Sequence, residues 1–398
     1  MTKKTISIRW IFLCCWFTYL TAYLCRVNFS SAMSAITLER GLSAEHLGIV
    51  GAVFYAIYAC GQLVNGYIGD KVQANRFILL ALAGTMLCNL GMSFAAGLGS
   101  MLALWGLNGV FQSMFWSTII RVLAQNIPAE KRATYSMGIS LAMPAAYIVS
   151  WGLLGQCLNG AAVRWYFLLP VGAAVLMAIA WLAISQKAEF GLTEDRKNKT
   201  SIVGTFRFLV EEKLTWMIGV CMLHGLIKEG AAYWTPLLIS QMDGIGSVSP
   251  FLLACVLPSA NLVGIIVSKM LLGKGGTNPY KTLIGIFVGI AAIAAGLMLG
   301  SASLFLIGMM ALISGLAYAN NTILMSFIPM QYTERNMVAS IIGVFDFASY
   351  AGAAISTYVL GRVLESYGFS PLPGIWLGAA LVAIVLASVV VKKKRRAA

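Results

Sequence analysis

The feature that most constrains this chain is a series of long apolar runs, each about as long as a membrane is thick. A helix rises 1.5 Å per residue, so about 20 apolar residues cross the hydrocarbon core of a bilayer. About twelve such runs can be counted. They lie near residues 8–33, 47–69, 76–96, 98–124, 134–158, 165–186, 214–240, 250–272, 281–300, 302–328, 337–362 and 373–391. Only 11% of the 398 residues are charged, so we expect an all-α polytopic membrane protein.

The basic residues are distributed unevenly between the loops. They raise the net charge to +14, and nearly all of them fall in alternate loops or in the two tails, whereas Arg40, Arg164 and Arg362 fall on the other side. By the positive-inside rule, both termini are expected in the cytoplasm of a multi-pass protein of the cytoplasmic (plasma) membrane. The positive charge is therefore interpreted as a signal of membrane topology and not of nucleic-acid binding. Contact with anionic lipid headgroups is a secondary expectation.

The longest polar stretch divides the apolar runs evenly. We predict a six-helix bundle over 1–186, a cytoplasmic linker with an interfacial segment over 187–213, and a second six-helix bundle with a basic cytoplasmic tail over 214–398. Six spans, a linker and six more spans are typical of two parallel repeats around a central cavity. A monomer is expected.

One cation lies inside the first apolar run. Arg26 follows Tyr23 on a polar stripe at helical spacing, and an isolated guanidinium at that depth is unfavourable by roughly 2.5 kcal/mol or more. Two interpretations are open. Arg26 either extends to the outer headgroups, or it binds an anion along a pathway.

A second cation lies inside the first run of the second half. Lys228 lies near the middle of that run, His224 is one turn earlier on the same face, and Glu229 follows it. Glu229 points about 100° away around the helix, so it need not neutralise Lys228 directly. Because Arg26 and Lys228 occupy equivalent places in two repeats, we expect them to meet near the midplane, where a small anion would relieve their repulsion.

Other polar residues occur within the apolar runs. Tyr23, Gln112 and Asn320 are expected to hydrogen-bond the rest of a substrate. Asp346 is expected to supply an internal counter-charge; alternatively, it carries a proton or is solvated near the inner face. Glu229 and His224 are further candidates for a proton or counter-charge role, although a lone His in a membrane more often bonds a neighbouring helix.

The loop between the second and third runs contains a motif. Gly66, Asp70 and Lys71, with Arg76 at the start of the next helix, resemble the signature that the major facilitator superfamily carries at this place. Gly66 permits close helix contact, and Asp70 can cap a helix or pair with a base in one state of a transport cycle. The motif is interpreted as a gate, although any membrane-protein loop contains Asp and Lys.

With these residues placed, the chain resembles the organophosphate:phosphate antiporter family of major facilitators, over nearly its whole length. The similar pieces are YLCRVNFSSAM, GYIGDK, the residues Gln112, Trp116 and Arg121, KEGAAYWTPLLI and FDFASYAGAA. The resemblance implies that Arg26 and a second base at Lys228 bind the phosphate group of an organic phosphate. It also implies that this organic phosphate is exchanged for inorganic phosphate by alternating access. Two departures are Lys228 in place of Arg, and Met143 where glycerol-phosphate carriers have His.

We therefore expect a secondary transporter of a small organic anion, most simply a phosphorylated metabolite exchanged for inorganic phosphate. The alternatives are proton-coupled transport of another organic anion or drug, and a non-transporting sensor of a phosphorylated metabolite. An enzyme is not expected, because the sequence has no nucleotide loop, metal cluster or nucleophile triad, and no cofactor or metal is implied.

Overall fold

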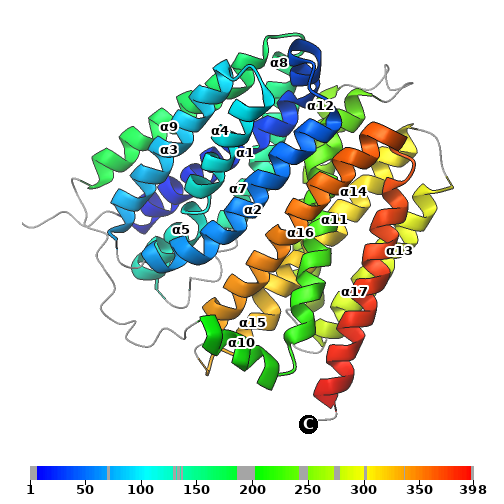
Figure 1. Ribbon diagram of the computed structural model, residues 1–398. Helices are drawn as coiled ribbons and strands as arrows, with labels where there is room; N and C mark the ends of the chain where they lie inside the picture. The colour runs from blue at the N-terminus through cyan, green and yellow to red at the C-terminus, as the bar shows by residue number, and fades with distance from the viewer. Residues whose placement is uncertain are drawn as a thin grey trace, which may run out of the picture. The chain divides into compact units, whose positions relative to one another are not determined.

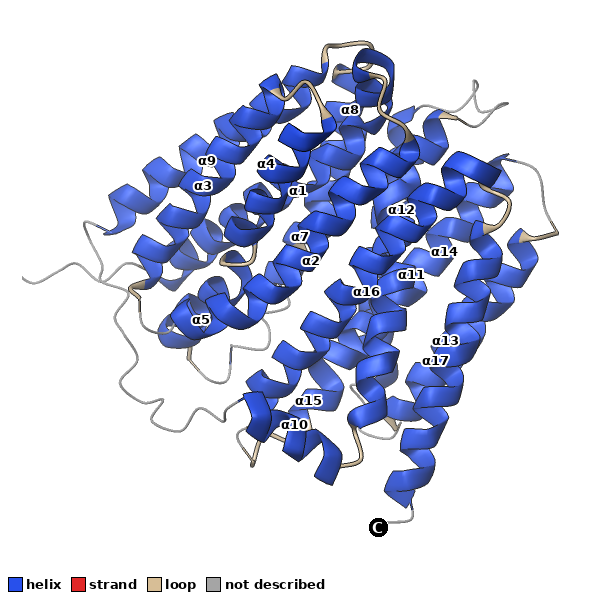
Figure 2. Cartoon of the chain, viewed as in Figure 1, coloured by secondary structure: helices blue, strands red, loops and turns tan. Residues whose placement is uncertain are grey.

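The computed structural model describes residues 7–69, 72–128, 131, 135, 138–185, 202–241, 250–272, 278–299, 303–335 and 337–395. Their regular structure is helical throughout, and the described ranges contain no strand (Figure 2). Ten of the described helices are long and apolar enough to cross a membrane. This confirms the predicted all-α polytopic fold.

Two predicted spans do not meet those criteria, each for a different reason. Run 98–124 forms two helices, α4 (Leu98–Gln112) and α5 (Phe115–Asn126), with Ser113 between them. Run 214–240 forms α11 (Thr215–Ser240), a helix of 26 residues whose hydropathy is lowered by polar residues near its middle. The first run therefore falls short in helix length, and the second in hydropathy.

The chain divides into two compact units. The first comprises Met1–Leu42 and Cys60–Arg196, and the second comprises Ser43–Ala59 and Lys197–Ala398. Helix α2 (Ala44–Gly69) therefore contributes its first part to the second unit and its last part to the first. The predicted boundaries at 186 and 214 stay a prediction, and most of the predicted linker, residues 187–201, lies outside the described residues.

The first unit is built around the long helix at the start of the chain. Besides α4 and α5, its described helices are α1 (Ile8–Arg40), α3 (Ala74–Phe94), α7 (Ala142–Tyr147), the π-helical turn η1 (Ile148–Leu154), α8 (Gly155–Cys157) and α9 (Val163–Ser185). Helix α1 packs against α5, α7 and α9, and α3 lies beside α4 and α9 (Figure 1).

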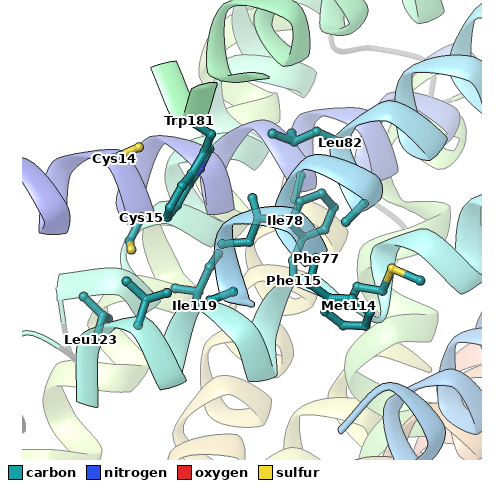
Figure 3. Close-up of a cluster of buried hydrophobic side chains, with 14 of the residues drawn as sticks. Cys14, Cys15, Phe77, Ile78, Leu82, Met114, Phe115, Ile119, Leu123 and Trp181 are labelled. Atoms are coloured by element: carbon teal, nitrogen blue, oxygen red, sulfur yellow. The ribbon is translucent and has the colours of Figure 1, made fainter. Parts of the chain in front are cut away.

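A cluster of large apolar side chains forms the core of the first unit (Figure 3). Trp181 of α9 packs with Phe77 and Ile78 of α3 and with Phe115 and Ile119 of α5. The indole Nε1 of Trp181 donates to Thr18 Oγ1 at 2.7 Å, which satisfies its one buried polar group. Packing of this cluster holds α1 in place between its neighbours.

The second unit is arranged around α11. Its other helices are α10 (Ile202–Glu211), α12 (Pro250–Leu272), α13 (Pro279–Leu297), α14 (Ser303–Thr322), the π-helical turn η2 (Ile323–Phe327), α15 (Ile328–Met330), α16 (Val338–Tyr367) and α17 (Leu372–Arg395). Helix α11 packs against α14, α16 and α17, α12 packs against α14, and α13 packs against α17.

Glycines allow α11 and α16 to approach closely. A Cβ atom on Gly225 would collide with the carbonyl oxygen of Ser349, and one on Gly352 would collide with that of Met222. Small residues at such crossings bring membrane helices into van der Waals contact, which is a main source of their association. The crossing fixes the turn of α11 that precedes Lys228.

The close crossing of α11 and α16 predicts that adding one methyl group at Gly225 destabilises the protein. Gly225→Ala should destabilise the protein by about 1–3 kcal/mol, because the backbone of α16 cannot move aside cheaply. Gly343→Ala, on α16 where an added Cβ meets nothing within 4 Å, is the matched control and should leave stability unchanged or raise it by up to about 1 kcal/mol. Thermal unfolding of the purified protein in detergent measures both, and equal melting temperatures for the two variants would contradict the packing argument.

Candidate functional site

In the first unit, Arg26 and Tyr23 lie together on α1. Arg26 is buried, with 6% of its surface exposed, and its guanidinium carbon lies 5.2 Å from the centroid of the Tyr23 ring. This is within the range of a cation–π contact. Burial favours the interpretation of Arg26 as a group directed into the protein over that of a side chain directed to the headgroups.

Side-chain amides of two neighbouring helices bind the backbone of α1 at this turn. Gln112 Nε2 donates to the carbonyl of Ala22 at 3.0 Å, and Asn108 Nδ2 and Asn89 Nδ2 each donate to the carbonyl of Cys25 at 3.1 Å. These carbonyls immediately precede Tyr23 and Arg26 in the chain. The amides therefore hold the turn that carries both residues.

This geometry gives Gln112 a role that differs from the expected one. Its NH₂ group binds α1, and its predicted contact with a substrate stays a prediction. Sequence reasoning missed Asn89, although a lone Asn inside the apolar run 76–96 was a visible signal, because buried amides must find partners.

Aromatic rings surround the same part of α1. Tyr19 contacts Tyr23 and Trp116 at centroid distances of 5.0 and 5.2 Å, and Tyr147 lies 6.2 Å from Tyr23 and 4.6 Å from Trp151. The π-helical turn η1 begins directly after Tyr147. Such turns often occur at functional sites, where they reorient side chains.

In the second unit, Lys228 forms an ion pair with its neighbour in sequence. Lys228 Nζ lies 3.0 Å from Glu229 Oε1, and the two residues are only 5% and 3% exposed. The ammonium also donates to Asn321 Oδ1 at 3.4 Å, and it lies 5.6 Å from the ring centroids of both Tyr318 and Tyr350. Lys228 is thus enclosed by one carboxylate, one amide and two aromatic rings.

The ion pair corrects our expectation that Glu229 need not neutralise Lys228 directly. The two Cα–Cβ bonds diverge around the helix, but both side chains are long enough to bend toward each other, and a buried charge strongly favours such a partner. The predicted counter-charge role of Asp346, a half-buried residue of α16, stays a prediction.

His224 shares the partner of Lys228. Its Nε2 lies 3.3 Å from Asn321 Oδ1, so both side chains reach the same amide. This confirms that His224 and Lys228 lie on one face of α11. Asn321 itself was not among the residues expected to bind substrate; the adjacent pair of Asn residues at 320–321 was the available signal.

Several buried polar atoms on these helices have no hydrogen-bond partner within the part of the chain that the structure describes. They include both amide atoms of Asn320, the hydroxyl of Ser349 and Nδ1 of His224. Asn320 directly precedes Asn321 on α14, and Ser349 directly precedes Tyr350 on α16. Buried polar groups left unsatisfied are costly, so these atoms are candidate donors and acceptors for a ligand.

The first part of α2 completes the polar network of the second unit. Tyr55 donates from its hydroxyl to Glu229 Oε2 at 3.0 Å, and Tyr233 of α11 donates to the carbonyl of Leu47 at 2.7 Å. Glu45 pairs with Arg362 of α16 at 3.3 Å. The role of Tyr55 was not foreseen, because an aromatic residue in an apolar run gives no sign of its hydroxyl partner.

The predicted gate motif is only partly visible. Gly66 lies in α2, and Arg76 is an exposed residue of the first turn of α3. Asp70 and Lys71 lie outside the described residues. The gate stays a prediction.

Helices of membrane-spanning length with ionisable groups buried among them define an integral, multi-pass membrane protein. In a comparison with protein families, residues 15–357 match the Major Facilitator Superfamily, so the chain belongs to this family of transporters and is not an enzyme.

Individual relatives are distant but cover nearly the whole chain. The D-galactonate transporter of Escherichia coli O6:H1 is 23% identical, over 89% of this chain and 88% of its own length. A probable hexose phosphate transport protein of Chlamydia muridarum is 21% identical, over 94% and 89%. The crystal structure of the nucleoside transporter NupG superposes with a TM-score of 0.75 at 13% identity, over 96% of this chain and 98% of that one.

The Lys228–Glu229 pair predicts non-additive effects on stability. Lys228→Met should cost about 3–5 kcal/mol, because it leaves the Glu229 carboxylate buried without its cation. Lys228→Met/Glu229→Gln should recover most of that loss. The measurement is the melting temperature of the three proteins in detergent, and a double variant no more stable than Lys228→Met would contradict the pairing.

Proposed function

We propose that this protein is a secondary transporter that moves a small organic anion, preferably a phosphorylated metabolite, across the cytoplasmic membrane by alternating access. The observation that carries the proposal is Lys228, a cation on a buried stretch of α11 beside polar atoms that lack partners among the described residues. A cation is kept at such a depth when it serves a substrate or an ion pathway.

Arg26 supports the proposal from the first unit. It is the only other cation that the sequence places deep inside an apolar run, and it occupies the equivalent position of the first repeat. We propose that Arg26 and Lys228 bind the same anionic group, with Tyr23 and Asn320 as further hydrogen-bond partners. A planar guanidinium can bind phosphate or carboxylate with two hydrogen bonds, while the ammonium acts as a point charge.

The names of the related transporters and the two cationic side chains together indicate which anionic group the substrate carries. One relative is named for hexose phosphates and another for D-galactonate, which bears a carboxylate. Two bases match the double charge of a phosphate monoester better than the single charge of a carboxylate. Phosphate is therefore the proposed group, and the proposed mode is exchange for inorganic phosphate.

A second candidate function is proton-coupled transport of another organic anion. The observation that favours it is Glu229, a carboxylate that is 3% exposed and takes part in the same network as Lys228. Intramembrane carboxylates commonly carry protons in transporters.

Transport into reconstituted liposomes separates the two functions. Liposomes preloaded with inorganic phosphate should take up a labelled hexose phosphate faster than empty liposomes, and an uncoupler should not reduce this uptake. Uptake that needs no internal anion and collapses with the uncoupler would contradict exchange and support proton coupling. D-galactonate, offered in the same assay, tests the carboxylate alternative.

Arg26→Ala should strongly reduce uptake at substrate concentrations below the KM, because charge-assisted hydrogen bonds to the anion contribute about 1.5–3 kcal/mol. This energy corresponds to a loss of affinity of about 10- to 150-fold. The variant should still be found in the membrane. Arg164→Ala, which removes a cation from a predicted outer loop, is the control. Uptake by Arg26→Ala at the wild-type rate would overturn the assignment of Arg26.

Lys228→Arg should retain uptake of a phosphate ester, because a guanidinium offers more donors to the same oxygens. The quantity to compare is the KM for the hexose phosphate in membranes with matched protein amounts. An inactive but normally folded Lys228→Arg carrier would show that the ammonium itself, and not positive charge in general, is required.

A further inference from the structure

A single carboxylate of the second unit has two different partners. Glu229 Oε1 lies 3.0 Å from Lys228 Nζ, and Glu229 Oε2 accepts the hydroxyl of Tyr55 at 3.0 Å. One oxygen is thus held by the proposed substrate-binding cation and the other by a residue of α2. Glu229 therefore links the binding cation to another helix.

The charge of this pair bears directly on anion binding. Lys228 and Glu229 together are neutral, and both are buried. An anion that joined the intact pair would place a second negative charge close to the first in a medium of low dielectric, where repulsion is strong. Binding is more favourable when the anion takes the place of the Glu229 carboxylate at the ammonium.

We propose that Glu229 is an internal substitute for the transported anion: it occupies Lys228 in the empty protein and is displaced when the anion binds. Tyr55 determines how firmly Glu229 is held in the empty state, because its hydrogen bond must be weakened or broken when the carboxylate moves. This inference rests on the proposed function, since it assumes that Lys228 binds the anion.

The same displacement reaches helix α2. Tyr55 belongs to the segment Ser43–Ala59, which is part of the second unit. Two other contacts hold this segment: Leu47 accepts a hydrogen bond from Tyr233, and Glu45 pairs with Arg362. Binding of an anion at Lys228 removes one of the polar contacts of this segment. Occupancy of the site and attachment of α2 are therefore coupled, because the ligand favours the state in which Glu229 has moved.

The first test is the dissociation constant of inorganic phosphate, measured by isothermal titration calorimetry on the full-length protein in detergent. Glu229→Gln should bind phosphate about tenfold more tightly than the wild type, because the competing charge is gone. Glu212→Gln, which removes the same charge from an exposed pair with Arg335, is the control and should leave the dissociation constant unchanged.

A second pair of variants leaves the net charge unchanged and does not depend on the folding of Glu229→Gln. Tyr55→Phe should tighten phosphate binding by about twofold to tenfold, the range expected for one hydrogen bond. Tyr233→Phe removes a hydroxyl that binds the same α2 segment at Leu47, and it controls for general loosening of the segment. The effect of Tyr55→Phe should disappear in a Glu229→Gln background, while any effect of Tyr233→Phe should persist there.

Each outcome has one meaning. Phosphate binding by Glu229→Gln that equals or is weaker than wild-type binding overturns the role of Glu229. Tighter binding by Glu229→Gln together with unchanged binding by Tyr55→Phe overturns the link to α2. Absence of phosphate binding in the wild type and in every variant overturns the proposed function, and this inference with it.

Discussion

A charge buried in an apolar medium needs a partner, and this constraint determines how the second unit is arranged around Lys228. The ammonium is provided with a carboxylate, an amide and two aromatic faces from α11, α14 and α16. Glycine at the crossing of α11 and α16 brings these helices close together, and Tyr350 of α16 lies beside the ammonium. The helix packing of the second unit and the surroundings of Lys228 are therefore linked.

The first unit meets the same requirement differently. There the backbone beside Arg26 is held by amides of α3 and α4, and the guanidinium lies by the ring of Tyr23. These contacts orient the cation through its backbone and through an aromatic face. If the two bases bind one anion, their surroundings differ. Lys228 is paired with the Glu229 carboxylate, whereas Arg26 lies on a turn of α1 that is held by side-chain amides.

Much of this could be predicted from the sequence, and the rest could not for physical reasons. Hydrophobic length alone predicted the helices, because a bilayer permits few other structures. Polar residues are rare inside apolar runs because their burial is costly, and this singled out Arg26, His224 and Lys228 as candidate site residues. The partners could not be predicted in detail, because periodicity gives the direction of the Cα–Cβ bond and not that of a long side chain. Glu229 was a candidate counter-charge, but its direct pairing with Lys228 was not expected. Tyr55 was missed because its contact joins residues 174 positions apart.

The central claim is that Arg26 and Lys228 bind one and the same anion, and a thermodynamic cycle tests it most directly. The quantity to measure is the dissociation constant of inorganic phosphate for the wild type, Arg26→Ala, Lys228→Ala and the double variant. Shared binding predicts strong coupling, so that the double variant loses little more affinity than the weaker-binding single variant. Losses that simply add, as for two independent residues, or a double variant that binds phosphate like the wild type, would contradict the account.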